Sequence, residues 1–380
     1  MIIKTSIVMP CLDEERFIGR AVESLLEGAG DDVEILVVDG GSRDQTRDLV
    51  RGFAERGAPV RLLDNPRRRV SAAMNIGIRE ARGDWIVRAD AHCVYPPRYA
   101  RRCVELLEKT GAANAGGVQV PVVEALEARA GGGSGRGFQA AVALALRHPL
   151  GVGNARWRLG RRSGFVDTVY LGAFRRDLFE EIGGFDEEAD SNQDAELNMR
   201  IRAAGKTVYL DHTLEVLYYP RESLRGLARQ FFRYGRGRAR TALKHRRLTS
   251  WRQAAAPLLL VGLGGSLVAA VLNPMFLLVP AAYAAGLAVF ALLSRFPGLK
   301  CGGREESPGP FAGTGRVPAS TRSAANAQGQ AGARAGLGCR LRVALVWAVM
   351  HISWGAGFLS DPFLRRKSAV IGNVDSGSMR

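Results

Sequence analysis

Short apolar runs alternate with longer stretches of helical pattern over the first part of the chain. The apolar runs have the length of strands and cover residues 6–10, 34–38, 60–63 and 85–89. The stretches between them predict helices at residues 17–26, 46–56 and 70–81. In the first of these, apolar side chains recur every three or four positions on one stripe. Strands that alternate with helices build right-handed βαβ units. The pattern therefore predicts an α/β domain around a mostly parallel, Rossmann-like sheet.

The pattern is less regular between residues 90 and 250. A Gly-rich stretch at residues 130–137 predicts a mobile loop or an edge connection. Residues 195–204 predict a helix that Gly205 closes as a C-cap. Further strands are predicted at residues 166–174 and 208–210, and a very basic helix at residues 224–245.

Hydropathy changes sharply near residue 250. Residues 254–272 and 275–293 carry no charge, and each is near the ~20 residues that span a bilayer. A third apolar stretch at residues 343–359 is shorter and contains polar side chains. We therefore divide the chain as follows: an α/β domain (1–250), a transmembrane helical hairpin (251–294), a disordered Gly/Ala/Arg-rich linker (295–342), a third membrane or interfacial helix (343–360) and a basic tail (361–380).

Flanking charges favour two spans over three. A single hairpin places both Arg252 and Arg295 on the cytoplasmic side, as the positive-inside rule requires. Three spans would place Arg365, Arg366 and Lys367 outside, which conflicts with that rule. We therefore expect a multi-pass protein whose third apolar stretch is re-entrant or interfacial. A buried helical hairpin in a soluble core is the alternative.

The formal net charge of +16 suits nucleic acid, an anionic membrane face or a phosphorylated substrate. Aromatic residues are only 7% and form no basic-aromatic platform, so no nucleic-acid partner is expected. Five cysteines without a C-x-x-C pair are typical of a reducing compartment. The N-terminal apolar run is too short for a secretory signal, which predicts a cytoplasmic α/β domain.

Acidic residues follow the predicted strands, where ligands bind in parallel sheets. Asp90 and His92 are alternate residues of an extended segment, so both side chains can converge on one Mg²⁺ or Mn²⁺ shared with phosphate oxygens. The alternative is a turn aspartate beside a surface histidine. Asp39, before Gly40 and Gly41, suits a contact with a nucleoside or, alternatively, a structural turn.

Two further candidates lie on predicted helices. Asp194 begins the helix at 195–204, where it is either a general base or an ordinary acidic first-turn residue. Gln230, Arg233 and Tyr234 lie in the very basic helix. That helix is either a basic collar beside a membrane or a site that holds a diphosphate.

Seven segments in order resemble family 2 glycosyltransferases of GT-A fold, and most closely the branch of succinoglycan-type exopolysaccharide glucosyltransferases. They are SIVMPCLDEERFI, ILVVDGGSRDQT, SAAMNIGIREARGDWIVRADAH, VYLGAFRR, EEIGGFDE, NQDAELNMRIRAAG and RQFFRYGRGRART. The segment HISWGAGFL resembles the same branch. The resemblance spans about residues 3–250 and resumes at about 343–360. It implies a GT-A nucleotide-diphospho-sugar transferase domain followed by membrane helices.

The resemblance also implies roles for matching positions. In it, Pro10, Asp13 and Glu14 line the uridine pocket, and Asp39 binds the base or ribose. Asp90 and His92 replace the usual DXD metal site, with Asp90 also binding the nucleotide-sugar. Asp194 is the acceptor-activating catalytic base. Gln230, Arg233 and Tyr234 resemble the QxxRW element of processive synthases, with Tyr in place of Trp, which leaves processivity open.

These roles imply an inverting enzyme that moves a hexose, glucose being expected, from a UDP-sugar to a lipid-linked or polysaccharide acceptor at the cytoplasmic membrane face. Its setting would be exopolysaccharide or cell-envelope glycan synthesis. A dehydrogenase is disfavoured because Pro10-Cys-Leu-Asp-Glu14 lacks the glycines of a dinucleotide-binding turn. A non-enzymatic protein that binds nucleic acid or lipid through its charge would leave the strand-end acids unexplained.

Overall fold

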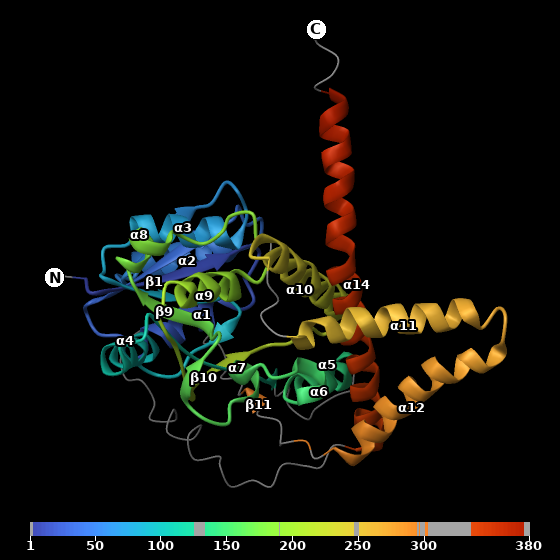
Figure 1. Cartoon of the computed structure of the whole chain (residues 1–380). Helices are drawn as coiled ribbons and strands as arrows, with labels where there is room; N and C mark the ends of the chain where they lie inside the picture. The colour runs from blue at the N-terminus through green and yellow to red at the C-terminus, as the bar shows by residue number, and fades with distance from the viewer. Residues whose placement is uncertain are drawn as a thin grey trace.

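The computed structural model describes residues 3–124, 134–189, 191–246, 251–294, 296, 301–302 and 336–375. A mixed sheet runs through the N-terminal domain in the order β3-β2-β1-β4-β9-β6-β10-β5, with β8 paired to β10 (Figure 1). Its strands are β1 (Thr5–Cys11), β2 (Val33–Asp39), β3 (Val60–Asp64), β4 (Trp85–Arg88), β5 (Cys93–Val94), β6 (Asn114–Pro121), β8 (Gly164–Val166), β9 (Tyr170–Arg175) and β10 (Val208–Tyr218).

Helices cover both faces of this sheet (Figure 1). They are α1 (Ile18–Leu26), α2 (Thr46–Glu55), α3 (Val70–Glu80), α4 (Tyr99–Thr110), α5 (Ser134–Leu146), α6 (Pro149–Val152), α7 (Arg156–Leu159), α8 (Leu178–Ile182) and α9 (Gln193–Ala203). All seven residues of β2 are buried, which explains why residues 35–38 are all apolar rather than alternating. Ile35 and Val37 enter one apolar cluster and Leu36 and Val38 the other, so the sheet separates two cores.

The parallel part of the sheet matches the prediction and positions the site. Strands β3, β2, β1 and β4 are parallel neighbours, and Cys11 at the end of β1 pairs with Asp39 at the end of β2. Val8 of β1 pairs with Arg88 of β4. The carboxyl ends of these strands therefore meet at one edge. Gly77 permits α3 to lie close to β1, since a Cβ there would be 2.3 Å from Val8.

Beyond β4 the sheet differs from the predicted pattern. Strand β9 is antiparallel to both β4 and β6, while β10 is parallel to β6. The strand predicted at 166–174 is divided into β8 and β9, with Leu171 at a positive φ of 63°. The strand predicted at 208–210 extends to Tyr218 through a register shift between Leu210 and Glu215, because three polar residues interrupt its apolar pattern.

The loop predicted at 130–137 is wrong at its end, because α5 begins at Ser134; residues 125–133 lie outside the described residues. The linker predicted at 295–342 is likewise wrong at its C-terminal end, which is helical. Its residues 295, 297–300 and 303–335 lie outside the described residues. Strand β11 (Cys301–Gly302) pairs with β7 (Val123–Glu124), and helix α14 begins at Leu337.

The C-terminal helices form a distinct part of the structure. A short helix η1 (Trp251–Ala254) leads into α11 (Ala255–Ala269), and η2 (Pro274–Leu277) leads into α12 (Leu278–Leu293). Together α11 and α12 form a V-shaped hairpin that projects from the domain (Figure 1). Among the residues that the structure describes, two helical segments are long and apolar enough to cross a membrane, Pro274–Leu293 and Leu337–Asp361. At 15 residues, α11 is shorter than either.

Helix α14 (Leu337–Asp375) is far longer than the apolar stretch that predicted it, and it crosses the whole structure (Figure 1). It contacts α10 (Leu224–Lys244), α11, α12 and α5. Trp347 is fully buried and donates a hydrogen bond from Nε1 to the carbonyl oxygen of Ala145 in α5. His351 joins Tyr283 of α12 to the carbonyl of Leu150. The apolar cluster of the sheet thus continues into α12 and α14.

Candidate active site

The loops that follow β1 and β2 are bound together by hydrogen bonds. The amide of Asp13 donates to Oγ of Ser42 at 2.9 Å, and the amide of Arg43 donates to Oδ1 of Asp13 at 2.8 Å. The amide of Glu14 donates to Oγ1 of Thr46 at 2.8 Å. Asp13 adopts a left-handed φ of 53° to make this turn. The bonded residues are 29 to 32 positions apart in the sequence. The two loops therefore form a single rim at the carboxyl ends of β1 and β2.

Asp39 lies beneath this rim and is fully buried. Its carboxylate accepts hydrogen bonds from the amides of Gly41 and Ser42, from Oγ of Ser42, and from Nη1 of Arg47 at 2.7 Å. Burial alone would raise the pKa of Asp39, but Ser42 and Arg47 outweigh it and the pKa lies below its ordinary value. The geometry matches the turn interpretation. A direct nucleoside contact by Asp39 remains a prediction.

Asp90 is held by three side chains that the sequence did not single out. Tyr170 donates to its Oδ2 at 3.1 Å, and Nη2 of Arg88 donates to its Oδ1 at 3.3 Å. The hydroxyl of Tyr95 bonds both the amide and the carbonyl of Asp90. Burial alone would raise the pKa of Asp90, but Arg88, His92 and Tyr170 outweigh it and keep the pKa low. The carboxylate is therefore ionised.

His92 lies between the β1 loop and β10. Its Nδ1 is 3.2 Å from Oε1 of Glu14, and its ring meets that of Tyr218 edge-on at 5.8 Å. Burial alone would lower the pKa of His92, but Glu14 and the charge of Asp90 raise it above its ordinary value. A carboxylate behind one ring nitrogen is the usual support of a metal-binding histidine, because it orients the other nitrogen.

Arg88 connects Asp90 to Asp194. It ends β4, its side chain is 6% exposed, and its Nη1 donates to Oδ1 of Asp194 at 2.5 Å. Burial raises the pKa of Asp194 to about 6, with Arg88 opposing and the charge of Asp90 adding to the rise. A charged residue inside the apolar run at 85–89 was a visible indication of this role, and our sequence analysis missed it.

The loop before α9 is positioned by α3. Asn75 accepts a hydrogen bond from the amide of Phe185 at 2.8 Å and donates to the carbonyl of the same residue at 2.9 Å. The ring of Phe185 lies 5.9 Å from the Arg88 guanidinium. At the other end, buried Glu196 of α9 accepts a hydrogen bond from Lys244 of α10 at 2.8 Å. Asp194 is therefore fixed by contacts on both sides of its helix.

The three candidates on α10 separate into two groups. Gln230 is buried and donates from Nε2 to the hydroxyls of Tyr218 at 3.0 Å and of Tyr234 at 3.1 Å. Because Tyr218 also contacts His92, this network reaches the acidic cluster. The Arg233 side chain is exposed and lies outside the network. Pro10 is half-buried at the end of β1.

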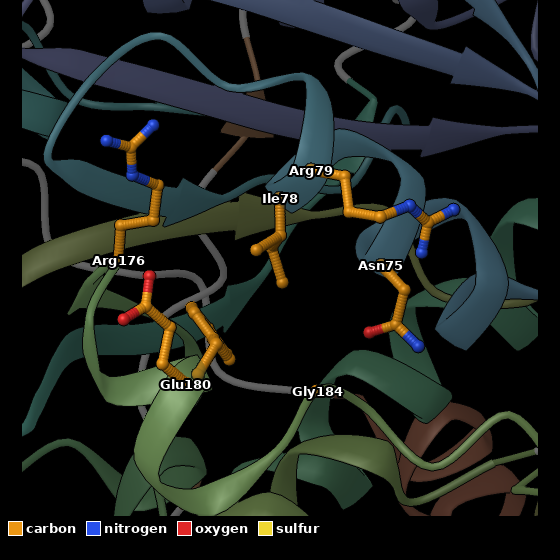
Figure 2. A pocket seen from close by; sticks show the side chains of 7 residues that line it. Asn75, Ile78, Arg79, Arg176, Glu180 and Gly184 are labelled. Carbon is orange, nitrogen blue, oxygen red and sulfur yellow. The ribbon is translucent and has the colours of Figure 1, made fainter.

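A cavity of about 470 Å³ lies elsewhere, between α3 and α8. Arg79 and Arg176 lie on opposite sides of its opening (Figure 2). Its lining residues are Asn75, Ile78, Arg79, Arg176, Phe179, Glu180 and Gly184. None of these was predicted as a site residue, and the cavity lies against the outer side of the loop that Asn75 anchors.

Asp90 and His92 suit a metal that is shared with substrate. Within the described part of the chain, no three His, Cys, Asp or Glu side chains form a cluster that could hold an ion. Mg²⁺ and Mn²⁺ often use only one or two protein ligands and complete their shell with phosphate oxygens and water. One ionised carboxylate and one imidazole backed by Glu14 fit that requirement.

Comparison with known proteins identifies the family of this chain. Residues 6–183 match the model of the family described as glycosyl transferase family 2. The chain is 37% identical over 250 residues to the succinoglycan biosynthesis protein ExoA of Rhizobium meliloti, covering 65% of this chain and 72% of that protein. The chain belongs to glycosyltransferase family 2. The resemblance noted in the sequence is confirmed, and the chain is an enzyme rather than a purely binding protein.

Two other similarities are more distant. A dolichyl N-acetyl-α-D-glucosaminyl phosphate 3-β-D-2,3-diacetamido-2,3-dideoxy-β-D-glucuronosyltransferase of Methanococcus voltae is 24% identical over 240 residues, covering 60% of this chain and 71% of that protein. A mannosyltransferase of Pyrobaculum calidifontis, solved with GDP-Man and Mn²⁺, superposes with a TM-score of 0.53 at 19% identity, covering 94% of this chain and 86% of that one. The latter confirms the GT-A fold of this family 2 glycosyltransferase.

Proposed function

We propose that this family 2 glycosyltransferase moves a hexose, glucose being expected, from a UDP-sugar to a lipid-linked or polysaccharide acceptor. The reaction takes place at the cytoplasmic membrane face in exopolysaccharide or cell-envelope glycan synthesis. The observation that carries the proposal is the single guanidinium of Arg88, which brings the carboxylates of Asp90 and Asp194 to the same strand-end edge. The similarity to a succinoglycan biosynthesis protein supports the glycan setting.

Asp194 acts as the general base. With a pKa of about 6 it is mostly ionised at neutral pH and remains basic enough to accept a proton. It takes the proton of an acceptor hydroxyl, whose oxygen forms a bond to the anomeric carbon. The bond from that carbon to the diphosphate oxygen breaks, and its electron pair leaves with UDP. One in-line displacement with one base inverts the anomeric centre.

The donor lies at the rim formed by the β1 and β2 loops. Pro10, Asp13 and Glu14 contribute to the uridine pocket, and Asp39 holds the turn that shapes it. Asp90 and His92 would hold a divalent ion, Mg²⁺ or Mn²⁺, and its positive charge would neutralise the leaving diphosphate. Tyr170 and Arg88 hold Asp90 ionised and oriented for this task.

Helix α10 forms the surface along which an anionic acceptor reaches the site. Gln230 and Tyr234 connect it to the site through Tyr218. On its outer side, Arg225, Arg229 and Arg233 are exposed and spaced by four residues, so they lie along one stripe. Arginine matches the geometry of phosphate oxygens with paired donors, and an acceptor carried on a lipid phosphate or diphosphate supplies such oxygens.

Membrane association follows from the C-terminal helices. The turn between α11 and α12 is among the most exposed apolar surface, with Val271 at 85% and Leu272 at 90% exposure. Exposed apolar surface that continues over a whole hairpin is typical of a membrane contact. Contacts of α14 with both the hairpin and α10 support a position of this acceptor helix near the bilayer.

A donor screen tests the proposal. Membranes from cells that overproduce the full chain are incubated with labelled UDP-glucose, UDP-galactose, UDP-GlcNAc or GDP-mannose, and Asp194→Asn membranes serve as the matched control. We expect label from a UDP-hexose in the lipid or polymer fraction, reduced to a trace in the control, with linkage analysis showing inversion. Label from GDP-mannose alone, or equal labelling by the control, would refute the proposal.

A further inference from the structure

We propose that Arg88 is a positioning residue for the transfer step, and that it acts by fixing the base Asp194 at a set distance from the donor-side carboxylate of Asp90. This inference rests on the proposed function of Asp194. Both contacts come from one planar side chain: Nη1 to Asp194 at 2.5 Å and Nη2 to Asp90 at 3.3 Å. The two acids lie on different elements, α9 and the segment after β4.

The surroundings leave Arg88 few other positions. Its side chain is 6% exposed, and the ring of Phe185 lies against the guanidinium at 5.9 Å. Its Nε is buried and, within the described residues, has no hydrogen-bond partner. An arginine placed here only to form a stabilising ion pair would be a poor solution, because the desolvation cost of burying a charge is barely offset by one pair. A bridge between two acids of the site explains its position better.

The contact with Arg88 also determines which carboxylate oxygen of Asp194 is free to accept a proton. Arg88 occupies Oδ1, whereas Oδ2 has no hydrogen-bond partner among the described residues, and the side chain is 21% exposed. A base needs one free lone pair that faces its substrate. On the donor side, Asp90 likewise has one oxygen on Arg88 and the other on Tyr170. The guanidinium thus orients both carboxylates at once.

Arg88→Lys separates this geometric role from a role in charge alone. Lysine keeps the positive charge but is a single point donor and cannot reproduce a planar fork across two acids. Arg61→Lys is the matched control, because Arg61 also bridges two carboxylates, Glu34 and Glu80. Arg61 lies on β3 and pairs with Leu36, which is midway along β2. This position is away from the strand-end acids.

We expect Arg88→Lys to lower kcat by about 10²-fold, since a displacement of about 1 Å in a catalytic group has that effect. The donor KM and the affinity for UDP should stay within about threefold of wild type, because the lost interaction acts on the transfer step. Arg61→Lys should leave kcat and KM unchanged. A wild-type kcat in Arg88→Lys, or a loss confined to donor KM, would overturn the inference.

The double variant tests whether Arg88 acts through Asp194. In the Asp194→Asn background, Arg88→Lys should reduce the residual transfer by less than about twofold, because residues that act as one unit are not additive. A full further loss would mean that Arg88 acts elsewhere. If Asp194→Asn alone retained wild-type activity, the proposed base would fail, independently of Arg88. Should Arg88→Lys not fold, Arg88→Gln, which buries no charge, should show the same loss of kcat; wild-type kcat there overturns the inference.

Discussion

Nδ1 of His92 lies 3.2 Å from Oε1 of Glu14, and this contact gives the two nitrogens of the ring different roles. The nitrogen beside the carboxylate carries a proton toward it, and Nε2 is left for a metal. Because Glu14 and Asp90 raise the pKa of His92, a metal must compete with a proton there. The apparent metal affinity should therefore fall as the pH decreases through that raised pKa.

The first prediction concerns the metal itself. Transfer should require Mn²⁺ or Mg²⁺ and should be abolished by EDTA, and Asp90→Ala should lose activity that added metal does not restore. The matched control is Asp84→Ala at the opposite end of the same strand, whose side chain is 82% exposed and should be dispensable. Activity is measured against metal concentration. Full turnover in EDTA would refute the metal requirement.

Glu14→Gln gives the second prediction. An amide in place of the carboxylate removes the charge that supports His92, and loss of such a partner typically lowers metal affinity by about 10- to 100-fold. The metal concentration for half-maximal activity should rise by that factor while kcat at saturating metal is largely kept. An unchanged metal requirement would place Glu14 in the uridine pocket only.

The third prediction concerns the proposed base. Asp194→Asn should reduce transfer to a trace while the affinity for the nucleotide-sugar persists. In the wild type, kcat/KM should fall as the pH decreases below about 6, because Asp194 becomes protonated and cannot accept the acceptor's proton. A pH-rate profile and UDP-sugar titration calorimetry measure the two effects. Lost donor binding in Asp194→Asn would show that the base is misassigned.

The fold was predictable where the determinants are local. In the strand predicted at 34–38, residues 35–38 are continuously apolar because both faces of the strand are covered. The structure extends this strand by only one residue at each end, to Val33–Asp39. The strand at 208–210 was underestimated because Asp211 and His212 interrupt the apolar pattern, while β10 continues through an irregularity that only its neighbour β6 defines.

The site was predictable only in part, for a physical reason. The sequence identified Asp90 at the end of a predicted strand and Asp194 at the start of a predicted helix, as separate acids. It did not identify Arg88 as their connection, because that contact joins positions 106 residues apart. Tyr170 was missed for the same reason: it reaches Asp90 from a strand antiparallel to its neighbours. Hydropathy also could not show that Trp347 packs on protein, since lipid and protein interiors are equally apolar.

The fourth prediction concerns the crossing of α10 and α14. A Cβ at Gly357 would lie 2.0 Å from the carbonyl oxygen of Phe232, so Gly357→Ala must separate the two helices. Overpacking of this kind costs about 1–3 kcal/mol, which should lower the Tm in detergent and reduce transfer. Gly264→Ala on α11 is the control, because nothing lies within 4 Å of its Cβ. Equal Tm values for the two variants would contradict the close crossing.

The last prediction tests the membrane hairpin. Truncation at residue 250 would also remove α14 from α10 and α5, so a point substitution is cleaner. Val289 of α12 is 52% exposed, and Val289→Arg leaves the protein's own contacts intact. An arginine at the centre of a span costs about 2.5–3.5 kcal/mol, and Val289, toward the end of Pro274–Leu293, should show part of that cost. Vesicle flotation should show a larger soluble fraction for Val289→Arg than for Leu49→Arg, a comparably exposed position on α2. Equal flotation of both variants would mean that α12 does not enter the membrane, and that its exposed apolar face is covered by something other than lipid.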